Sequence, residues 1–136
     1  GTLASFGKMK YNGGEQWKQL QKRVLTYREI NSKEWSEEFK IKSKQAYDRF
    51  KENGEELSVH ALSRLPRLNK PGYETIQEKD VLDLIKSKPN YSEGEEKIIW
   101  FSKSKQLVVI KNKSSGDVVS IVRRKNKKEA WKDAGI

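Results

Sequence analysis

Hydrophobic positions in the first half of the chain recur at spacings of three and four residues, which is the period of an α-helix. The first stripe predicts an amphipathic helix over residues 16–30 and consists of Trp17, Leu20, Val24 and Tyr27. The second predicts a helix over residues 31–52 and consists of Trp35, Phe39, Ala46, Tyr47 and Phe50. Because these aromatic residues keep helical register, we expect them to face a core.

Polar residues mark the ends of these helices. Asn31, followed three residues later by Glu34, resembles a capping box for the second helix. The Asn53-Gly54 pair supplies its stop, because glycine readily takes the left-handed conformation that ends a helix. A third helix is expected over residues 76–87, capped by Thr75 and Glu78, with a buried face that consists of Val81, Leu84 and Ile85.

The central stretch, residues 58–67, carries the single histidine of the chain. Ser58 is a good N-cap for a short helix that begins at Val59, and Pro66 ends or bends that helix. His60 and Arg64, four residues apart, then share one helix face. The pattern predicts an imidazole and a guanidinium that point the same way.

After residue 96 the pattern becomes extended, with runs of β-branched and aromatic residues. It predicts strands over residues 97–102, 106–111 and 118–124, and the short connections make them an antiparallel meander. In the last strand, alternation places Val118, Ser120, Val122 and Arg124 on one face. The predicted fold class is α+β: N-terminal helices packed on a small antiparallel sheet of three or four strands.

The chain has 136 residues and divides into three predicted segments. Residues 1–14, rich in glycine, are expected to be a linker, residues 15–54 a helical segment, and residues 55–136 an α+β core with a basic tail. The start at Gly-Thr-Leu, without an initiating methionine, is typical of a piece of a larger protein.

Charge narrows the classes of partner. The net charge is +10, and residues 103–136 hold ten lysines and arginines against three acidic residues. Such a balance favours a polyanionic partner, which can be RNA, DNA, an acidic protein or an anionic lipid. For RNA, the expected contacts are Arg67, Lys70, Tyr73, Lys111, Arg124, Lys125, Lys127 and Lys128. The absence of cysteine excludes disulfides, and one histidine argues against a histidine-built metal site, so no metal or cofactor is predicted.

Cleavage of RNA without a metal needs few groups: a base for the 2′-OH, an acid for the leaving 5′-oxygen, and cations for the developing charge. His60 is the candidate acid or base, because imidazole titrates near neutral pH. Arginine can clamp a phosphate with two hydrogen bonds, and serine can position it. The candidate catalytic set consists of His60, Arg64, Ser120 and Arg123.

Several of these segments resemble the C-terminal toxin domains of bacterial polymorphic toxins. The resemblance covers residues 46–124 and rests on the run from Ala46 to Phe50, on Asn53-Gly54, on the Ser58-x-His60-Ala61-x-x-Arg64 pattern, on Asp80-Val81-Leu82 and on the valine-rich hairpins. It is to the ribonuclease superfamily that groups barnase, EndoU, colicin nuclease and RelE folds. His60 and Arg64 match its helical motif, and Ser120 and Arg123 its last-strand polar positions; Pro66 and Pro71-Gly72 depart from its commoner continuous helix.

The resemblance implies a ribonuclease, frequently directed at tRNA, that serves contact-dependent inhibition of competing bacteria. It implies a secreted or cell-surface effector delivered into the target-cell cytoplasm, a cognate acidic immunity protein, a monomer, and no membrane insertion by this fragment. Two other classes stay open. The same basic surface would suit a nucleic-acid-binding module without catalysis, and a third possibility is a protein-interaction domain of a secretion or phage apparatus.

Overall fold

The computed structural model describes the backbone of residues 3–134 and the side chains of residues 16–134. Within them the chain divides into two compact units, one that runs to Lys40 and one that begins at Ile41. The division falls inside the second helix, whereas the segment boundary that we expected from the sequence lies at residue 54.

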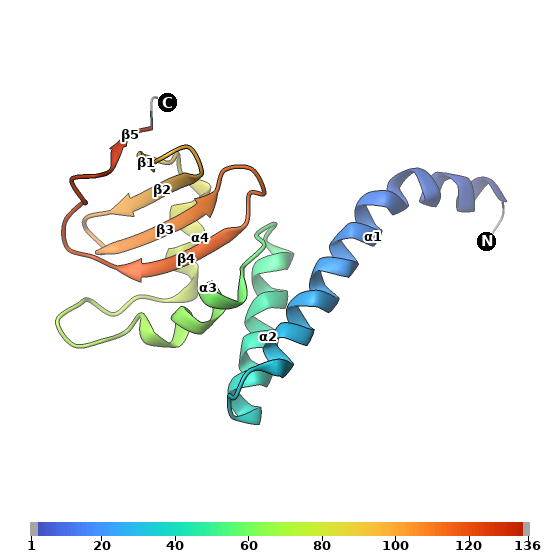
Figure 1. Cartoon of the computed structure of the whole chain (residues 1–136), viewed down its shortest axis with the longest axis horizontal. Helices are drawn as coiled ribbons and strands as arrows, with labels where there is room; N and C mark the ends of the chain where they lie inside the picture. The colour runs from blue at the N-terminus through green and yellow to red at the C-terminus, as the bar shows by residue number, and fades with distance from the viewer. Residues whose placement is uncertain (1–2, 135–136) are drawn as a thin grey trace. The chain divides into compact units, whose positions relative to one another are not determined.

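The first unit consists mainly of one long helix, α1 (Leu3–Ser32; Figure 1). The predicted linker over residues 1–14 is thus wrong from Leu3 onward, because the helix continues through Gly13 and Gly14. Each glycine costs about 1 kcal/mol in a helix, but a helix nucleated downstream adds residues more easily than it starts. The expected core stripe is also exposed, since Trp17 is 60%, Leu20 50% and Val24 42% accessible.

The helix α2 (Glu37–Glu52) begins later than the sequence suggested. The Ser36 hydroxyl accepts a hydrogen bond from the Phe39 amide at 3.1 Å, so Ser36 rather than Asn31 is the N-cap. The predicted stop is confirmed: Gly54 has a φ of 80°, and the Glu55 amide donates to the Phe50 carbonyl at 2.9 Å. Ala46, Tyr47 and Phe50 are buried as expected.

Two short helical segments and a longer helix follow in the second unit. They are α3 (Val59–Arg64), the 3₁₀ turn η1 (Leu65–Arg67) and α4 (Glu78–Lys86). The capping box of α4 consists of Gln77 and Asp80, two residues beyond the predicted pair of Thr75 and Glu78. The Gln77 amide donates to the Asp80 carboxylate at 2.7 Å. Val81 and Ile85 are buried against the sheet, as predicted.

The second unit is built on a five-stranded sheet with the order β4-β3-β2-β1-β5, and all four pairings are antiparallel. The strands are β1 (Tyr91–Glu93), β2 (Lys97–Ser102), β3 (Leu107–Asn112), β4 (Val118–Arg123) and β5 (Lys132–Asp133). The three predicted strands are confirmed, and the α+β class with them. The short strands β1 and β5 were not predicted, because they carry little of the apolar alternation that marks a strand.

A β-bulge changes the faces of β4. Lys111 pairs with Val118 but Ile110 pairs with Ser120, so Val119 is the extra residue. Val118 therefore joins Ile121 on one face, which corrects the predicted face that grouped it with Ser120. The bulge explains why Val118 and Ile121 are both fully buried.

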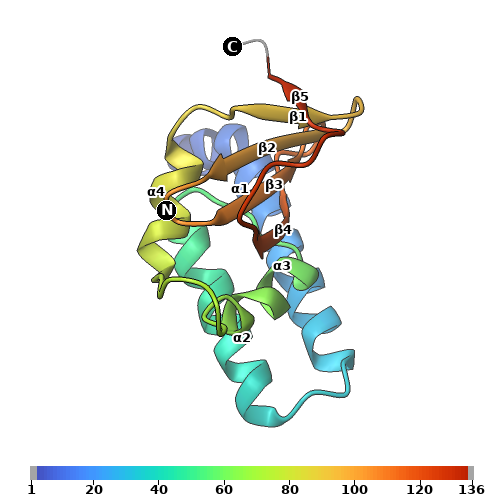
Figure 2. The same ribbon diagram turned by 90° about the vertical axis from the view of Figure 1, so that its left-hand side faces the viewer.

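Each face of the sheet is covered differently. The helix α4 packs on β2 and β3, as Figures 1 and 2 show, and the Trp100 indole donates to the Ser87 carbonyl at 2.7 Å. The opposite face carries a cluster of Ile99, Phe101, Val108 and Trp131. Trp131 belongs to the C-terminal segment, so this segment is itself part of the core.

Candidate functional site

The short helix α3 forms as the sequence predicts. The Ser58 hydroxyl accepts a hydrogen bond from the Ala61 amide at 3.1 Å, and it donates to the Val119 carbonyl at 3.3 Å. Val59, Ala61 and Leu62 are buried, whereas His60 is exposed. Burial of three neighbours fixes the helix against β4 and directs the imidazole to solvent.

Arg64 follows His60 by one helical turn and lines a small cavity of about 50 Å³. The cavity lies between η1 and its flanking residues on one side and β4 on the other, and is lined by Arg64, Arg67, Leu68, Lys70, Ile121, Val122 and Arg123. Arg64, Arg67 and Lys70 make no ion pair with a described carboxylate. The predicted cations of residues 64–70 are thus brought together with the last strand.

Arg123 lies in this region, but its guanidinium is committed to the protein backbone. It donates to the carbonyls of Gln106 at 3.0 Å, Leu68 at 2.8 Å, Glu74 at 2.7 Å and Lys105 at 2.9 Å. The residue is only 6% exposed. These contacts tie the loop after η1 to the sheet and occupy the guanidinium that the sequence suggested for catalysis.

Burial lowers the pKa of Arg123 from its ordinary value, while Tyr73 and Glu74 act in the opposite direction. An arginine keeps its charge even so, because its ordinary pKa lies far above neutral. The interior of the site therefore contains a fixed positive charge.

Ser120 does not join the site with Arg123. In β4, Ser120 pairs with Ile110 and Arg123 with Leu107, and these partners face opposite sides of the sheet. Ser120 thus lies on the face of the Trp131 cluster, whereas Arg123 lies on the face of α4. The expected four-residue catalytic set is divided, and His60 with Arg64 stays as its helical half.

Tyr73 has more contacts with cations than the sequence suggested. The distance to its ring centre is 5.0 Å from the Lys70 nitrogen, 5.4 Å from the Lys125 nitrogen and 5.1 Å from the Arg123 guanidinium carbon. The three residues come from a loop, a strand and the chain beyond it. Only the folded chain brings them to one ring.

The other predicted RNA contacts divide into two groups. Lys111 is turned away from solvent, since its ammonium lies 2.6 Å from a Glu55 carboxylate oxygen and its side chain is 18% exposed. The remaining ones lie on the segment between β4 and Trp131, where Arg124 is half-buried and Lys125, Lys127 and Lys128 are exposed. Lys111 is therefore paired with Glu55, whereas Lys125, Lys127 and Lys128 are accessible to a polyanion.

Over residues 16–134, no three side chains of His, Cys, Asp or Glu are grouped as a metal would need them. In the part of the chain that the structure describes, none of the helices combines the length and apolar character of a membrane span.

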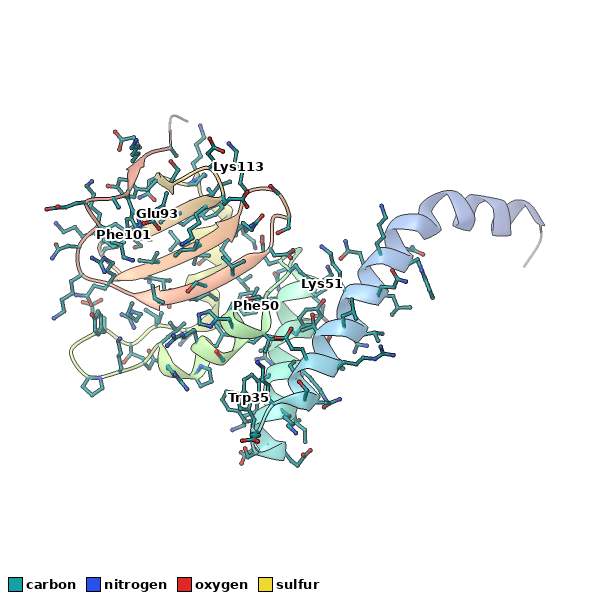
Figure 3. All side chains as sticks on the ribbon, in the orientation of Figure 1. Trp35, Phe50, Lys51, Glu93, Phe101 and Lys113 are labelled. Atoms are coloured by element: carbon teal, nitrogen blue, oxygen red, sulfur yellow. The ribbon has the colours of Figure 1, made fainter. Side chains whose placement is uncertain are left out.

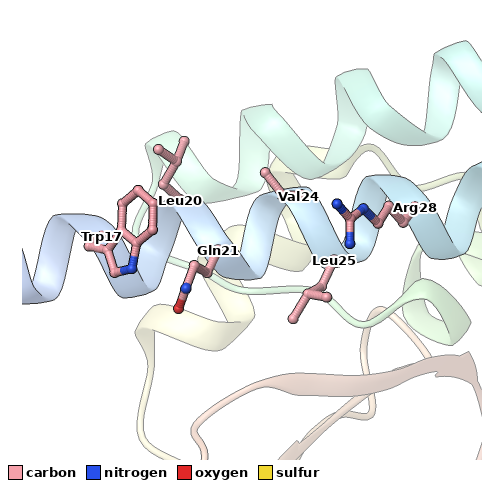
Figure 4. A pocket seen from close by; sticks show the side chains of 6 residues that line it. All are labelled: Trp17, Leu20, Gln21, Val24, Leu25 and Arg28. Carbon is pink, nitrogen blue, oxygen red and sulfur yellow. The ribbon is translucent and has the colours of Figure 1, made fainter.

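A larger cavity of about 370 Å³ runs along α1. Figure 4 shows its six lining residues, Trp17, Leu20, Gln21, Val24, Leu25 and Arg28. With one charged side chain among apolar ones, it offers no acid–base pair. It is a surface for apolar contact.

Comparison with protein-family models, with curated proteins and with solved structures found no match for this chain. The α+β fold stands on the structure itself, and membership of the barnase-like superfamily stays a prediction.

Proposed function

We propose that this chain is an endoribonuclease domain that cleaves RNA, with tRNA as the expected target, by attack of a 2′-OH on the adjacent phosphodiester without a metal ion. The observation that carries the proposal is the exposed imidazole of His60 one helical turn before Arg64, which lines a cavity with further unpaired cations. An accessible acid–base group beside a phosphate-binding surface is the minimum that this reaction needs.

In the proposed reaction, His60 accepts the proton of the 2′-OH, and the 2′-oxygen bonds to phosphorus. The bond from phosphorus to the 5′-oxygen breaks, and that oxygen takes a proton from water or from the imidazolium. The products are a 2′,3′-cyclic phosphate and a free 5′-OH. Arg64 stabilises the charge on the phosphorane, because a guanidinium donates two hydrogen bonds to phosphate oxygens.

The proposed biological setting follows from the resemblance to polymorphic toxin domains. The domain would act in interbacterial competition after delivery into the cytoplasm of a target cell, and an acidic immunity protein would neutralise it. Charge supports this partner, because a protein of net charge +10 attracts an acidic one.

The test is incubation of the purified chain with total tRNA in EDTA, alongside the His60→Ala and Arg64→Ala variants. We expect wild-type cleavage that leaves cyclic phosphate ends, and a loss of about 100-fold or more with His60→Ala. Lys113→Ala is the matched control, since Lys113 lies in the loop between β3 and β4 (Figure 3). Intact tRNA with the wild-type protein, or full activity with His60→Ala, would refute the proposal.

A nucleic-acid-binding module without catalysis is the second candidate. It is favoured by the division of the expected catalytic set, because Arg123 is held by backbone carbonyls and Ser120 faces the other side of the sheet. Shifted mobility of intact tRNA in a gel would select this candidate.

A protein-interaction domain is the third candidate, and the apolar cavity along α1 favours it. It would be selected if the chain neither cleaved nor bound RNA at moderate salt, where phosphate-driven affinity is measurable.

A further inference from the structure

Three cations surround Tyr73, and none of them forms an ion pair with a described carboxylate. Lys70 and Lys125 are exposed and form no ion pair with a described carboxylate, although both approach the ring that Arg123 also contacts. Glu74 is the carboxylate that acts on Arg123, yet it makes no ion pair with that guanidinium. The face of a tyrosine ring attracts cations, but the neutral ring does not cancel their three positive charges.

The backbone on either side of both lysines is held by contacts of neighbouring residues. Lys70 follows Asn69, whose side chain exchanges two hydrogen bonds with the backbone of Ile76, at 2.8 and 3.0 Å. Arg123 binds the carbonyls of Leu68 and Glu74, on either side of Lys70 and Tyr73. The loop that carries Lys70 is thus held by the hydrogen bonds between Asn69 and Ile76 and by those from the Arg123 guanidinium.

Lys125 belongs to a segment of residues 124–130, here named the basic loop, that is fixed at both ends. Arg123 precedes this loop, and its guanidinium donates four hydrogen bonds to backbone carbonyls. Trp131 follows it, 3% exposed, with its ring 5.7 Å from that of Phe101 and 5.8 Å from that of Tyr91. Inside the loop, Arg124 donates to the Asn126 carbonyl at 2.7 Å.

We propose that Lys70, Tyr73 and Lys125 form a binding site for one phosphate group of a nucleic-acid backbone. The inference rests on the proposed function only in that the phosphate belongs to the RNA. Lysine binds phosphate as a point charge, and two lysines held near one ring place two such charges around a single anion. Fixing the basic loop at both ends lowers the entropy lost when Lys125 binds.

The experiment measures binding of a fluorescent single-stranded RNA of about ten nucleotides with 2′-O-methyl groups, over a range of salt concentration. Its lack of 2′-OH groups prevents cleavage, so binding and catalysis are read separately. Lys70→Ala and Lys125→Ala should each raise Kd about three- to tenfold. Each should reduce the salt slope by less than about 0.7, the value for one phosphate on a single strand, because the other lysine still contacts that phosphate. Lys113→Ala, at the opposite end of β4, should leave both unchanged.

The double variant is the decisive measurement. If both lysines hold the same phosphate, Lys70→Ala with Lys125→Ala reduces the salt slope by about 0.7 in total, whereas two separate phosphates would give about 1.4 and overturn the proposal. Tyr73→Leu should weaken binding without removing a charge, because the ring organises the lysines. If that variant fails to fold, the lysine series still decides.

Two further outcomes would contradict the inference. Wild-type binding by both single variants, or an equal loss with Lys113→Ala, would mean a general basic surface. In an NMR titration, inorganic phosphate should shift Lys70 and Lys125 signals weakly and compete with the RNA; tight phosphate binding without competition would mean a site for the free anion. A chain that binds through these lysines but cleaves nothing keeps this site and refutes only the nuclease.

Discussion

Arg123 and Tyr73 are stacked with 5.1 Å between the guanidinium carbon and the ring centre. A cation that the sequence suggested for phosphate binding is therefore enclosed by the protein and used to fix the loop that carries Tyr73. We therefore propose the phosphate-binding role for Lys70 and Lys125, which form no ion pair with a described carboxylate.

Arg123→Lys should destabilise the chain by about 2–4 kcal/mol, although it keeps the charge. Lysine has no planar fork of donors, so several of the four carbonyls would lose their hydrogen bond in a buried place. Urea unfolding followed by circular dichroism measures the change. Arg124→Lys, at a half-buried position, is the control and should cost less than about 1 kcal/mol.

Trp131→Ala should cost about 3–5 kcal/mol, the range for a large aromatic removed from a core. Trp131 is 3% exposed and contacts Phe101 and Tyr91. The matched change is Trp17→Ala, because Trp17 is 60% exposed and its removal should change the free energy of unfolding by less than about 0.5 kcal/mol. Equal effects of the two variants would contradict the docking of the C-terminal segment.

Lys111→Met should destabilise the fold by a few kcal/mol, on the order of 3 kcal/mol, because Glu55 would keep an unpaired charge with a side chain only 14% exposed. Adding Glu55→Gln should restore part of the loss, and a double-mutant cycle in urea measures the coupling. Binding of the 2′-O-methyl RNA should not change in the folded variant. A rise in Kd as large as that of Lys125→Ala would return Lys111 to the RNA-binding surface.

Acid should weaken the start of α4 through Asp80. The Lys105 ammonium, then the Gln77 amide, lowers the pKa of the Asp80 carboxyl from its ordinary value. A lowered folded-state pKa means that this stabilisation is complete above the ordinary pKa, near 4, and is lost as pH falls through the folded value. Asp80→Asn should therefore be less stable than wild type at pH 7.

The difference in the free energy of unfolding between wild type and Asp80→Asn should become smaller below about pH 4. Urea midpoints at several pH values measure it. Salt should narrow it as well, because the Lys105 side chain is 51% exposed. A difference that stayed constant from pH 7 to pH 2 would show that Asp80 acts through its shape and not its charge.

Ser58→Ala should cost about 1 kcal/mol, since the cap of α3 loses its acceptor for the Ala61 amide. Ser63→Ala is the comparison, because the Ser63 hydroxyl donates to the His60 carbonyl at an exposed position. Thermal unfolding measures both. An equal cost would mean that the Ser58 hydroxyl adds nothing as a cap.

Local signals were enough for much of this chain. The apolar period predicted α4 and three strands, the Ser58 cap predicted α3, and Gly54 predicted the end of α2. Such features depend on contacts between residues that are close in the sequence, so the local order of side chains determines them. Where two local signals competed, as with Asn31 and Ser36, the sequence did not distinguish the cap that forms.

The site needed contacts between distant parts of the chain. Nothing near Arg123 in the sequence indicates that its guanidinium donates a hydrogen bond to the Leu68 carbonyl. The bulge at Val119 likewise places Val118 on the face of the sheet opposite to the predicted one. The sequence by itself determined which residues carry charge and where helices and strands form. Tertiary structure alone decided which charges are neutralised inside and which meet at Tyr73, because burial and pairing depend on what folding brings together.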